Sequence, residues 1–157
     1  MRKVFLFILA MVLSFLPGFV GVLFTPHGMS NVWYNALNKS VLTPDGWVFG
    51  VAWAVLYALL GIALFIIMNN QRRGVRKAGA YALFGIQMVL NALWCVLFFG
   101  VAMPVAAFVC IGALIFVTMI MIGAFGRISR GAAWLVVPYL AWLIFAAYLN
   151  GTILYLN

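Results

Sequence analysis

The chain has 157 residues, of which 69% are hydrophobic and only 6% are charged, and its formal net charge is +8. A soluble domain carries about 25% charged residues, so nine basic residues and one acidic residue cannot solvate a chain of this composition. The composition therefore excludes a soluble globular protein and indicates an integral membrane protein.

Five apolar runs are long enough to cross a bilayer, which takes about 20 helical residues each. They cover residues 4–24, 46–68, 78–99, 103–125 and 132–154. Backbone polar groups must be paired inside a bilayer, and most connections between the runs are short. We therefore predict an all-α fold, a single membrane domain over residues 1–157, in which five transmembrane helices pack antiparallel and a long loop joins the first two.

The basic residues follow the order of the spans. One set lies before the first span or in alternate connections: Arg2, Lys3, Arg72, Arg73, Arg76, Lys77, Arg127 and Arg130. The opposite side has Lys39 alone. This is the positive-inside pattern, which predicts a cytoplasmic N-terminus. We expect a multi-pass protein of a bacterial cell membrane. Contact with anionic lipid headgroups accounts for the net charge, and no nucleic-acid partner is expected.

The first span begins like a secretory signal, with Arg2 and Lys3 before an apolar run. No A-x-A-like cleavage site follows, and the apolar run resumes after Pro17, so we predict a retained helix. Proline removes one backbone hydrogen bond, and Pro17 is expected to kink this helix near its middle.

Residues 25–45 form the longest connection. The segment SNVWYNAL within it predicts a short amphipathic helix, with Ser30 or Asn31 as its cap. Long ordered loops commonly act as lids, whereas Trp and Tyr also favour the membrane interface. A lid and an interfacial anchor both remain open for Trp33 and Tyr34.

The second helix is predicted to start around Thr43-Pro44-Asp45. Thr43 is expected to be the N-cap and Pro44 the first helical residue, where its missing N–H costs nothing. Asp45, the only acid in the chain, would then lie in the first turn and complement the helix dipole. This structural role accounts for Asp45 without catalysis.

Two rows of residues follow the second span at helical spacing. The first row is small: Gly46, Gly50, Ala54 and Ala58. Small residues let membrane helices approach closely, so we predict a helix contact here, with Gly50 and Ala54 as one candidate dimer interface. The adjacent row of Trp53, Tyr57 and Gly61 is expected to line something else.

Polar side chains also lie inside the third and fifth spans. Gln87 and Asn91 are four residues apart, and Trp94 continues their face. Amides in hydrocarbon need a partner, and an interhelical hydrogen bond and a ligand contact both remain possible. The fifth span places Pro138, Trp142, Ala146 and Asn150 on one row. Three faces that mix aromatic, small and amide residues predict a pocket for a flat apolar ligand, although bundle packing alone can produce part of this pattern.

Conventional catalytic groups are scarce. The chain has one Asp, one His and no Glu, and its two cysteines show no metal-ligand spacing. We expect no metal site and no conventional enzyme.

Three stretches together resemble the TspO/MBR family, the translocator or tryptophan-rich sensory proteins. They read WYNALNKSVLTPDGWVFGVAWAVLY, QMVLNALWCVLFFG and PYLAWLIFAAYLNGTILYLN. The resemblance implies five transmembrane helices, commonly a homodimer, and a pocket that opens toward the first loop. It implies binding of porphyrins, notably protoporphyrin IX, or another hydrophobic small molecule, without an obligatory cofactor.

The positions that match the family's pocket agree with the faces found from the residues. The resemblance carries over Trp33, Tyr34, Trp53, Asn91, Trp142, Ala146 and Asn150. With their neighbours on the same faces, the predicted ligand-binding set also includes Tyr57, Gln87 and Trp94.

The chain departs from the family pattern in two places. The family's loop typically reads L-x-K-P-x-W-x-P-P, whereas residues 37–45 read LNKSVLTPD, so one aromatic contact of the lid is expected to be missing. The sterol-recognition pattern needs a basic residue after a tyrosine, and Leu156 and Asn157 follow Tyr155.

The leading functional hypothesis is porphyrin binding in tetrapyrrole sensing, transport or scavenging. The alternative is an enzyme that degrades porphyrin with light and oxygen, an activity assigned to some relatives of the family. Ion-coupled transport ranks low, because it usually needs acidic groups within the spans and none is present.

Overall fold

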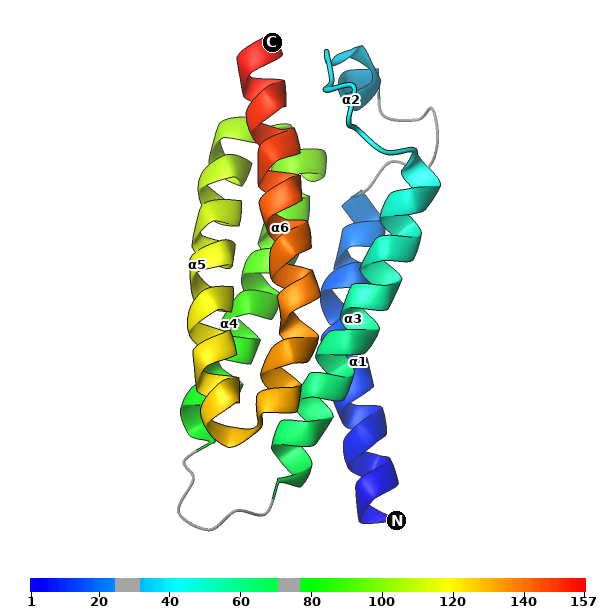
Figure 1. Ribbon diagram of the computed structural model, residues 1–157. Helices are drawn as coiled ribbons and strands as arrows, with labels where there is room; N and C mark the ends of the chain where they lie inside the picture. The colour runs from blue at the N-terminus through cyan, green and yellow to red at the C-terminus, as the bar shows by residue number, and fades with distance from the viewer. Residues whose placement is uncertain (25–31, 71–76) are drawn as a thin grey trace.

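The computed structural model describes residues 1–24, 32–70 and 77–157, and this part of the chain is helical without strands. Figure 1 shows the elements in order along an elongated bundle. They are α1 (Arg2–Phe24), α2 (Val32–Ala36), α3 (Gly46–Asn69), α4 (Ala78–Cys95), the π-helical turn η2 (Val96–Gly100), α5 (Pro104–Ile128) and α6 (Arg130–Leu156). The predicted all-α class is confirmed.

Five of these segments are long and apolar enough to span a membrane. α1, α3, α4 with η2, α5 and α6 contain between 23 and 27 residues each. At about 1.5 Å rise per residue, each exceeds the roughly 30 Å hydrocarbon core of a bilayer. Their ends agree with the predicted spans to within a turn of helix. The short helix predicted in the first connection is also confirmed as α2, whereas its predicted caps lie outside the described residues.

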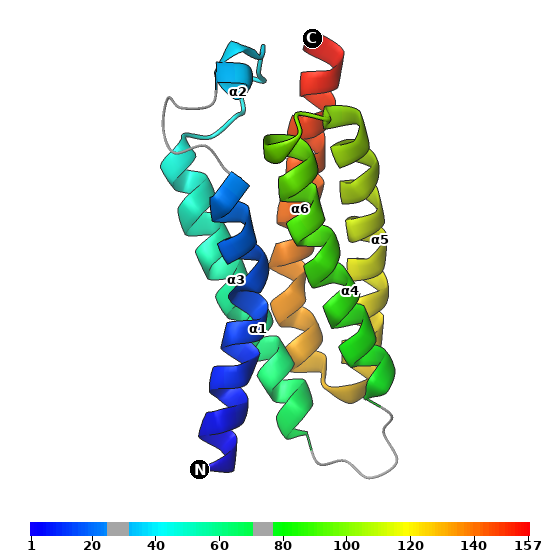
Figure 2. The ribbon, with the colours of Figure 1, turned by 180° about the vertical axis from the view of Figure 1, so that it is seen from behind.

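The long helices pack in two groups that contact each other along the bundle. α1 packs against α3, and α5 packs against both α4 and α6, while α3–α6 and α1–α4 contacts join the groups. Figures 1 and 2 place the N-terminus and the α5–α6 turn at one end, and α2 and the C-terminus at the other. Among the described basic residues, Lys39 alone lies at the end that carries α2.

Helices α1 and α3 approach each other closely at two glycines, Gly18 and Gly61. A Cβ on Gly61 would lie 2.5 Å from Met11 Sδ and 2.8 Å from Ser14 Oγ, and a Cβ on Gly18 would lie 2.8 Å from the ring of Tyr57. A side chain at Gly18 would therefore displace the Tyr57 ring, and one at Gly61 would press on the backbone of α1 at Met11. The close approach thus uses Gly61, on the row predicted to face elsewhere.

Within the described chain, no helix packs closely against the first part of the row Gly46, Gly50, Ala54 and Ala58. The alternative, a dimer contact through Gly50 and Ala54, stays a prediction. Added Cβ atoms on Gly46 and Gly50 meet no described atom within 4 Å, and Gly50 and Ala54 are exposed. The physical reason is that the buried residues of α3 begin only at Leu56. The first turns of α3 diverge from α6 in Figure 1, so small residues there border open space.

The second span begins at Gly46 as predicted, but the predicted cap and first turn of its helix were wrong. Helix α3 begins at Gly46, and Asp45 rather than Thr43 occupies the N-cap, without a side-chain cap hydrogen bond. Thr43 instead closes a turn, because its N–H donates to Ser40 O at 2.9 Å. The Ser40 Oγ accepts from Leu42 N at 3.1 Å, so the local turn of Ser40 competes with an earlier helix start.

The end of α4 widens into η2 before the chain reverses. The N–H of Val101 donates to Val96 O at 2.9 Å, an i→i+5 bond, and Met103 N donates to Leu97 O at 2.9 Å. Ala102 then takes φ 52°, a left-handed conformation that a side chain rarely adopts. Pi-turns within helices often occur at functional sites, and this one carries Phe98 into the bundle.

Candidate ligand-binding cavity

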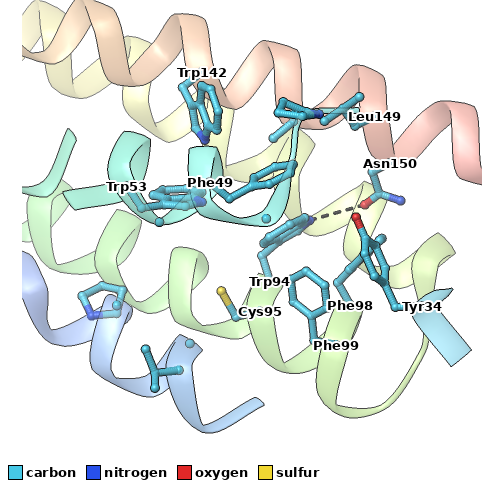
Figure 3. A pocket seen from close by; sticks show the side chains of 18 of the residues that line it. Tyr34, Phe49, Trp53, Trp94, Cys95, Phe98, Phe99, Trp142, Leu149 and Asn150 are labelled. Atoms are coloured by element: carbon cyan, nitrogen blue, oxygen red, sulfur yellow. Dashed lines mark hydrogen bonds between the residues drawn. The ribbon is translucent and has the colours of Figure 1, made fainter. Parts of the chain in front are cut away.

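A cavity of about 840 Å³ lies between α1, α3, α6 and the α4–η2 segment, beneath the connection that carries α2. Pockets for small ligands usually measure about 300–1,000 Å³ and are mostly apolar with a few placed polar groups. Figure 3 shows its walls, with side chains from four membrane spans and from the α2 connection converging on the same space. The size and lining both suit a large flat ligand.

Aromatic rings form two of the walls. On one side, Trp53 stacks on Tyr57 with centroids 5.3 Å apart and meets Trp142 edge-on at 6.5 Å and 84°. On the other side, Trp94 stacks on Phe98 at 5.2 Å and 14°. Figure 3 shows Trp53 and Trp142 on one side of the space and Trp94 and Phe98 on the other. These ring faces can stack on a planar aromatic ligand from different directions.

Small residues create the space between these rings. Gly46, Gly50 and Ala54 line the cavity from α3, Gly18 lines it from α1, and Ala146 lines it from α6. Trp53 directly precedes Ala54, so α3 presents a bulky side chain next to a very small one. The volume therefore depends on residues that contribute little or no side chain.

The deeper polar groups of the wall are largely engaged. Trp94 Nε1 donates to Asn150 Oδ1 at 3.3 Å, and Asn150 Nδ2 donates to Pro104 O at 3.0 Å. Asn150 thus joins α4 to the start of α5. Trp142 Nε1 is different, because it is buried and has no hydrogen-bond partner in the described chain. An unpaired buried N–H costs about 1–3 kcal/mol, so this donor is suited to a ligand acceptor.

A buried hydrogen-bonded chain lies behind the aromatic wall. Tyr57 OH donates to Asn91 Oδ1 at 2.7 Å, Asn91 Nδ2 donates to Tyr139 OH at 3.0 Å, and Tyr139 OH donates to Gln87 Oε1 at 2.9 Å. It joins α3, α4 and α6. Tyr57 borders the cavity, so Asn91 acts on the cavity through Tyr57. Gln87 Nε2 finds no partner among the described atoms.

Aromatic and charged groups occupy the mouth of the cavity. Tyr34, Lys39 and Asp45 line it, and Lys39 Nζ lies 4.5 Å from the centroid of the Tyr34 ring. Burial raises the pKa of the Tyr34 phenol, so this ring stays neutral at physiological pH. Trp33 lies beside it and packs edge-on against Phe98 at 5.7 Å.

The structure brings most of the predicted ligand-binding residues into one cavity. Those that line it are Tyr34, Trp53, Tyr57, Trp94, Trp142, Ala146 and Asn150. The other predicted residues lie beside it: Trp33 packs on Phe98, and Gln87 and Asn91 belong to the buried chain. For these two amides, the structure gives the interhelical hydrogen bond that sequence reasoning left as one of two possibilities.

Several lining residues were not predicted. Phe49 meets Trp142 at 5.9 Å, and its position four residues before Trp53 was a readable helical signal. Cys95 lies on the face that was recognised, next to Trp94. Phe98 stacks on Trp94, four residues before it, so the same helical spacing was readable there. Phe99 lies off that row, within η2. No sequence signal predicted that π-turn.

The described residues contain no group of three or more His, Cys, Asp or Glu side chains that could hold a metal ion. Cys95 is a free thiol in the wall, and Cys110 is buried with its Sγ 3.4 Å from Leu90 O. The chemistry that this lining offers directly is therefore stacking, apolar burial and hydrogen bonding.

These features define a multi-pass helical membrane protein with a tryptophan-lined cavity beneath a connecting loop. The sequence matches the TspO/MBR family over residues 8–156, and the chain belongs to that family. It is similar to the "Tryptophan-rich protein TspO" of Chlorobaculum tepidum, with 40% identity over 89% of this chain and 88% of the relative. It is also similar to the "Tryptophan-rich sensory protein" of Cereibacter sphaeroides (31%; 90% and 84%) and the human "Translocator protein" (34%; 84% and 78%).

Proposed function

We propose that this protein binds porphyrins, notably protoporphyrin IX, and similar flat apolar ligands in the cavity, and serves tetrapyrrole sensing, transport or scavenging. The observation that carries the proposal is the perpendicular pair of Trp53 and Trp142, 6.5 Å apart, on the wall of a cavity of about 840 Å³. A macrocycle stacked on one ring would meet the edge of the other, and both arrangements are favourable for aromatic groups.

The unpaired indole N–H of Trp142 supports the same class of ligand. Trp142 Nε1 is buried without a described partner and would donate to a ligand acceptor, such as a pyrrole nitrogen or a carbonyl oxygen. Flat hydrocarbons without acceptors would leave it unpaired. The cavity therefore favours a planar ligand that combines a large apolar surface with polar atoms.

The proposal includes the setting of the protein. By the positive-inside rule, the end that carries Arg2, Lys3, Arg127 and Arg130 would face the cytoplasm of a bacterial cell membrane, and the cavity mouth would face outward. A homodimer is part of the proposal because the family resemblance implies one. Cysteine accessibility at the α5–α6 turn would test the orientation, and native mass spectrometry would test the oligomer.

Binding is tested by quenching of tryptophan fluorescence with protoporphyrin IX. We expect the Trp53→Phe, Trp142→Phe double variant to bind at least about tenfold more weakly, which corresponds to about 1.4 kcal/mol. The matched control is Trp47→Phe, Trp134→Phe, because these tryptophans are 70% and 72% exposed and lie away from the lining. Equal affinity in both double variants, after correction for the lost emitters, would refute this placement of the ligand.

A second candidate function is light- and oxygen-dependent degradation of the bound porphyrin. It is favoured by the contact of Trp53 with both Tyr57 (5.3 Å) and Tyr139 (6.2 Å), a set of oxidisable rings that leads from the cavity into the core. Illumination of the complex in air, followed by absorption spectroscopy, separates the two candidates. Bleaching at the rate of free porphyrin in the same lipid would reject catalysis.

A further inference from the structure

Only two charged side chains line the cavity within the described residues, and both lie at its mouth. They are Lys39, in the connection between α2 and α3, and Asp45, at the N-cap of α3. The remainder of the described lining is neutral. The electrostatic selectivity of this cavity therefore depends on how these two groups present themselves to a ligand.

The ammonium group of Lys39 is held in place but has hydrogen-bonding capacity to spare. It lies 4.5 Å from the centroid of the Tyr34 ring, in a cation–π contact. No ion pair with Asp45, and no hydrogen bond to any other described group, involves this ammonium. A lysine ammonium has three N–H donors, so this group can still donate hydrogen bonds to a ligand acceptor.

The residues on both sides of Lys39 are hydrogen-bonded to the last turns of the chain or to α6. Asn38 N donates to Asn157 Oδ1 at 2.9 Å, and Asn157 Nδ2 donates back to Asn38 O at 3.0 Å. On the other side, the Ser40 and Tyr148 hydroxyls share a hydrogen bond of 3.2 Å. Lys39 lies between these two attachments, so its Cα is positioned from both directions. Such support is what places a recognition group accurately.

We propose that Lys39 is a carboxylate receptor, so that the cavity selects flat apolar ligands with an acidic group at one edge. This inference rests on the proposed function and names the class of ligand for the same site. The macrocycle would lie among the tryptophans, and its acid would reach the mouth and pair with the ammonium. A carboxylate that entered deeper would lose its solvation without gaining a cationic partner among the described residues.

Asp45 should have the opposite effect to Lys39 on the binding of an acidic ligand. Its carboxylate lines the same mouth and is exposed, so it repels an anionic ligand while Lys39 attracts it. Loss of the positive charge should weaken binding of an acidic ligand, and loss of the negative charge should strengthen it. An ester of the same ligand should respond to neither change, because it carries no charge to be recognised.

The test compares protoporphyrin IX with its dimethyl ester in nanodiscs of zwitterionic lipid, with the full chain. We expect Lys39→Met to weaken binding of the acid about tenfold and Lys39→Arg to retain it, while the ester changes less than about twofold. Asp45→Asn should tighten the acid about two- to threefold. Arg130→Gln, a matched loss of charge at the opposite end of the bundle, should change neither ligand.

The ratio of the two ligand responses removes differences in lipid partitioning, since each ligand is compared with itself across variants. Equal weakening of acid and ester by Lys39→Met would mean that the stem of Lys39 acts by shape, and this would overturn the inference. Unchanged binding of both would also overturn it while leaving the porphyrin cavity intact. Failure of the unmodified protein to bind either ligand would refute the proposed function itself, and the inference with it.

Discussion

Replacement of Tyr139 by phenylalanine tests the buried hydrogen-bonded chain most directly. The Tyr139 hydroxyl is fully buried, accepts from Asn91 at 3.0 Å and donates to Gln87 at 2.9 Å. Tyr139→Phe keeps the ring and removes both bonds, so the Asn91 N–H and the Gln87 carbonyl lose their partners together. Gln87 would then have neither end of its amide paired, because its Nε2 already lacks a described partner.

The magnitude follows from counting the orphaned groups. Each buried polar group left without a partner costs about 1–3 kcal/mol in soluble proteins, whereas single hydrogen bonds within membranes average about 0.6 kcal/mol. Two lost bonds therefore predict a destabilisation of about 1–4 kcal/mol. Tyr57→Phe removes only the 2.7 Å bond to Asn91 and should cost about half as much.

Unfolding by increasing SDS in mixed micelles, followed by far-UV circular dichroism, measures these differences. Tyr155→Phe is the control, because Tyr155 is 88% exposed and should leave the transition unchanged. The double variant Tyr57→Phe, Tyr139→Phe should be non-additive, since both hydroxyls bond to Asn91. A Tyr139→Phe variant as stable as Tyr155→Phe, or less affected than Tyr57→Phe, would refute the reasoning.

Three further predictions concern backbone and loop. Gly61→Ala should destabilise the protein by about 1–3 kcal/mol, because its Cβ would lie 3.2 Å from the backbone of Met11. Gly50→Ala is the control and should leave SDS unfolding unchanged, because that position borders open space. Equal destabilisation by both substitutions would contradict the assigned α1–α3 contact. Ala102→Gly should increase the free energy of unfolding by about 1 kcal/mol and so raise the melting temperature, since Ala102 has φ 52°. A lower melting temperature would contradict this prediction. Asn157→Ala should speed proteolysis of the α2–α3 connection, because it removes the reciprocal bonds to Asn38; an unchanged cleavage rate would show that these bonds do not hold the loop.

The spans were predictable because bilayer thickness imposes a length that apolar composition reveals directly. The helical rows were predictable for a different reason, because Trp53 with Tyr57, and Trp142 with Ala146, keep the same relative direction in any α-helix. The direction of each row was not. A small residue permits close packing, as at Gly61, or leaves a void, as at Gly50, and these outcomes look identical in sequence.

Other features depended on contacts between distant segments. The hydroxyl of Tyr139 joins Asn91 to Gln87, and this partner could not be predicted before the α4–α6 packing was known. For that reason the two amides were included among the predicted ligand contacts. The attachment of Asn38 to Asn157 joins residues 119 positions apart. The cap of α3 was assigned to the wrong residue because Ser40 forms a local turn that competes with the expected cap at Thr43.

The open positions on α3 separate the size of the cavity from the stability of the bundle. Gly46 and Gly50 line the cavity, and a methyl group added at either would touch no described atom. The tightly packed positions lie elsewhere, at Gly18 and Gly61. A single substitution at Gly46 or Gly50 would therefore narrow the cavity without disturbing helix packing within the described chain. Under the proposed function, the accepted ligand shape could diverge by one methyl group at a time while the fold stays the same.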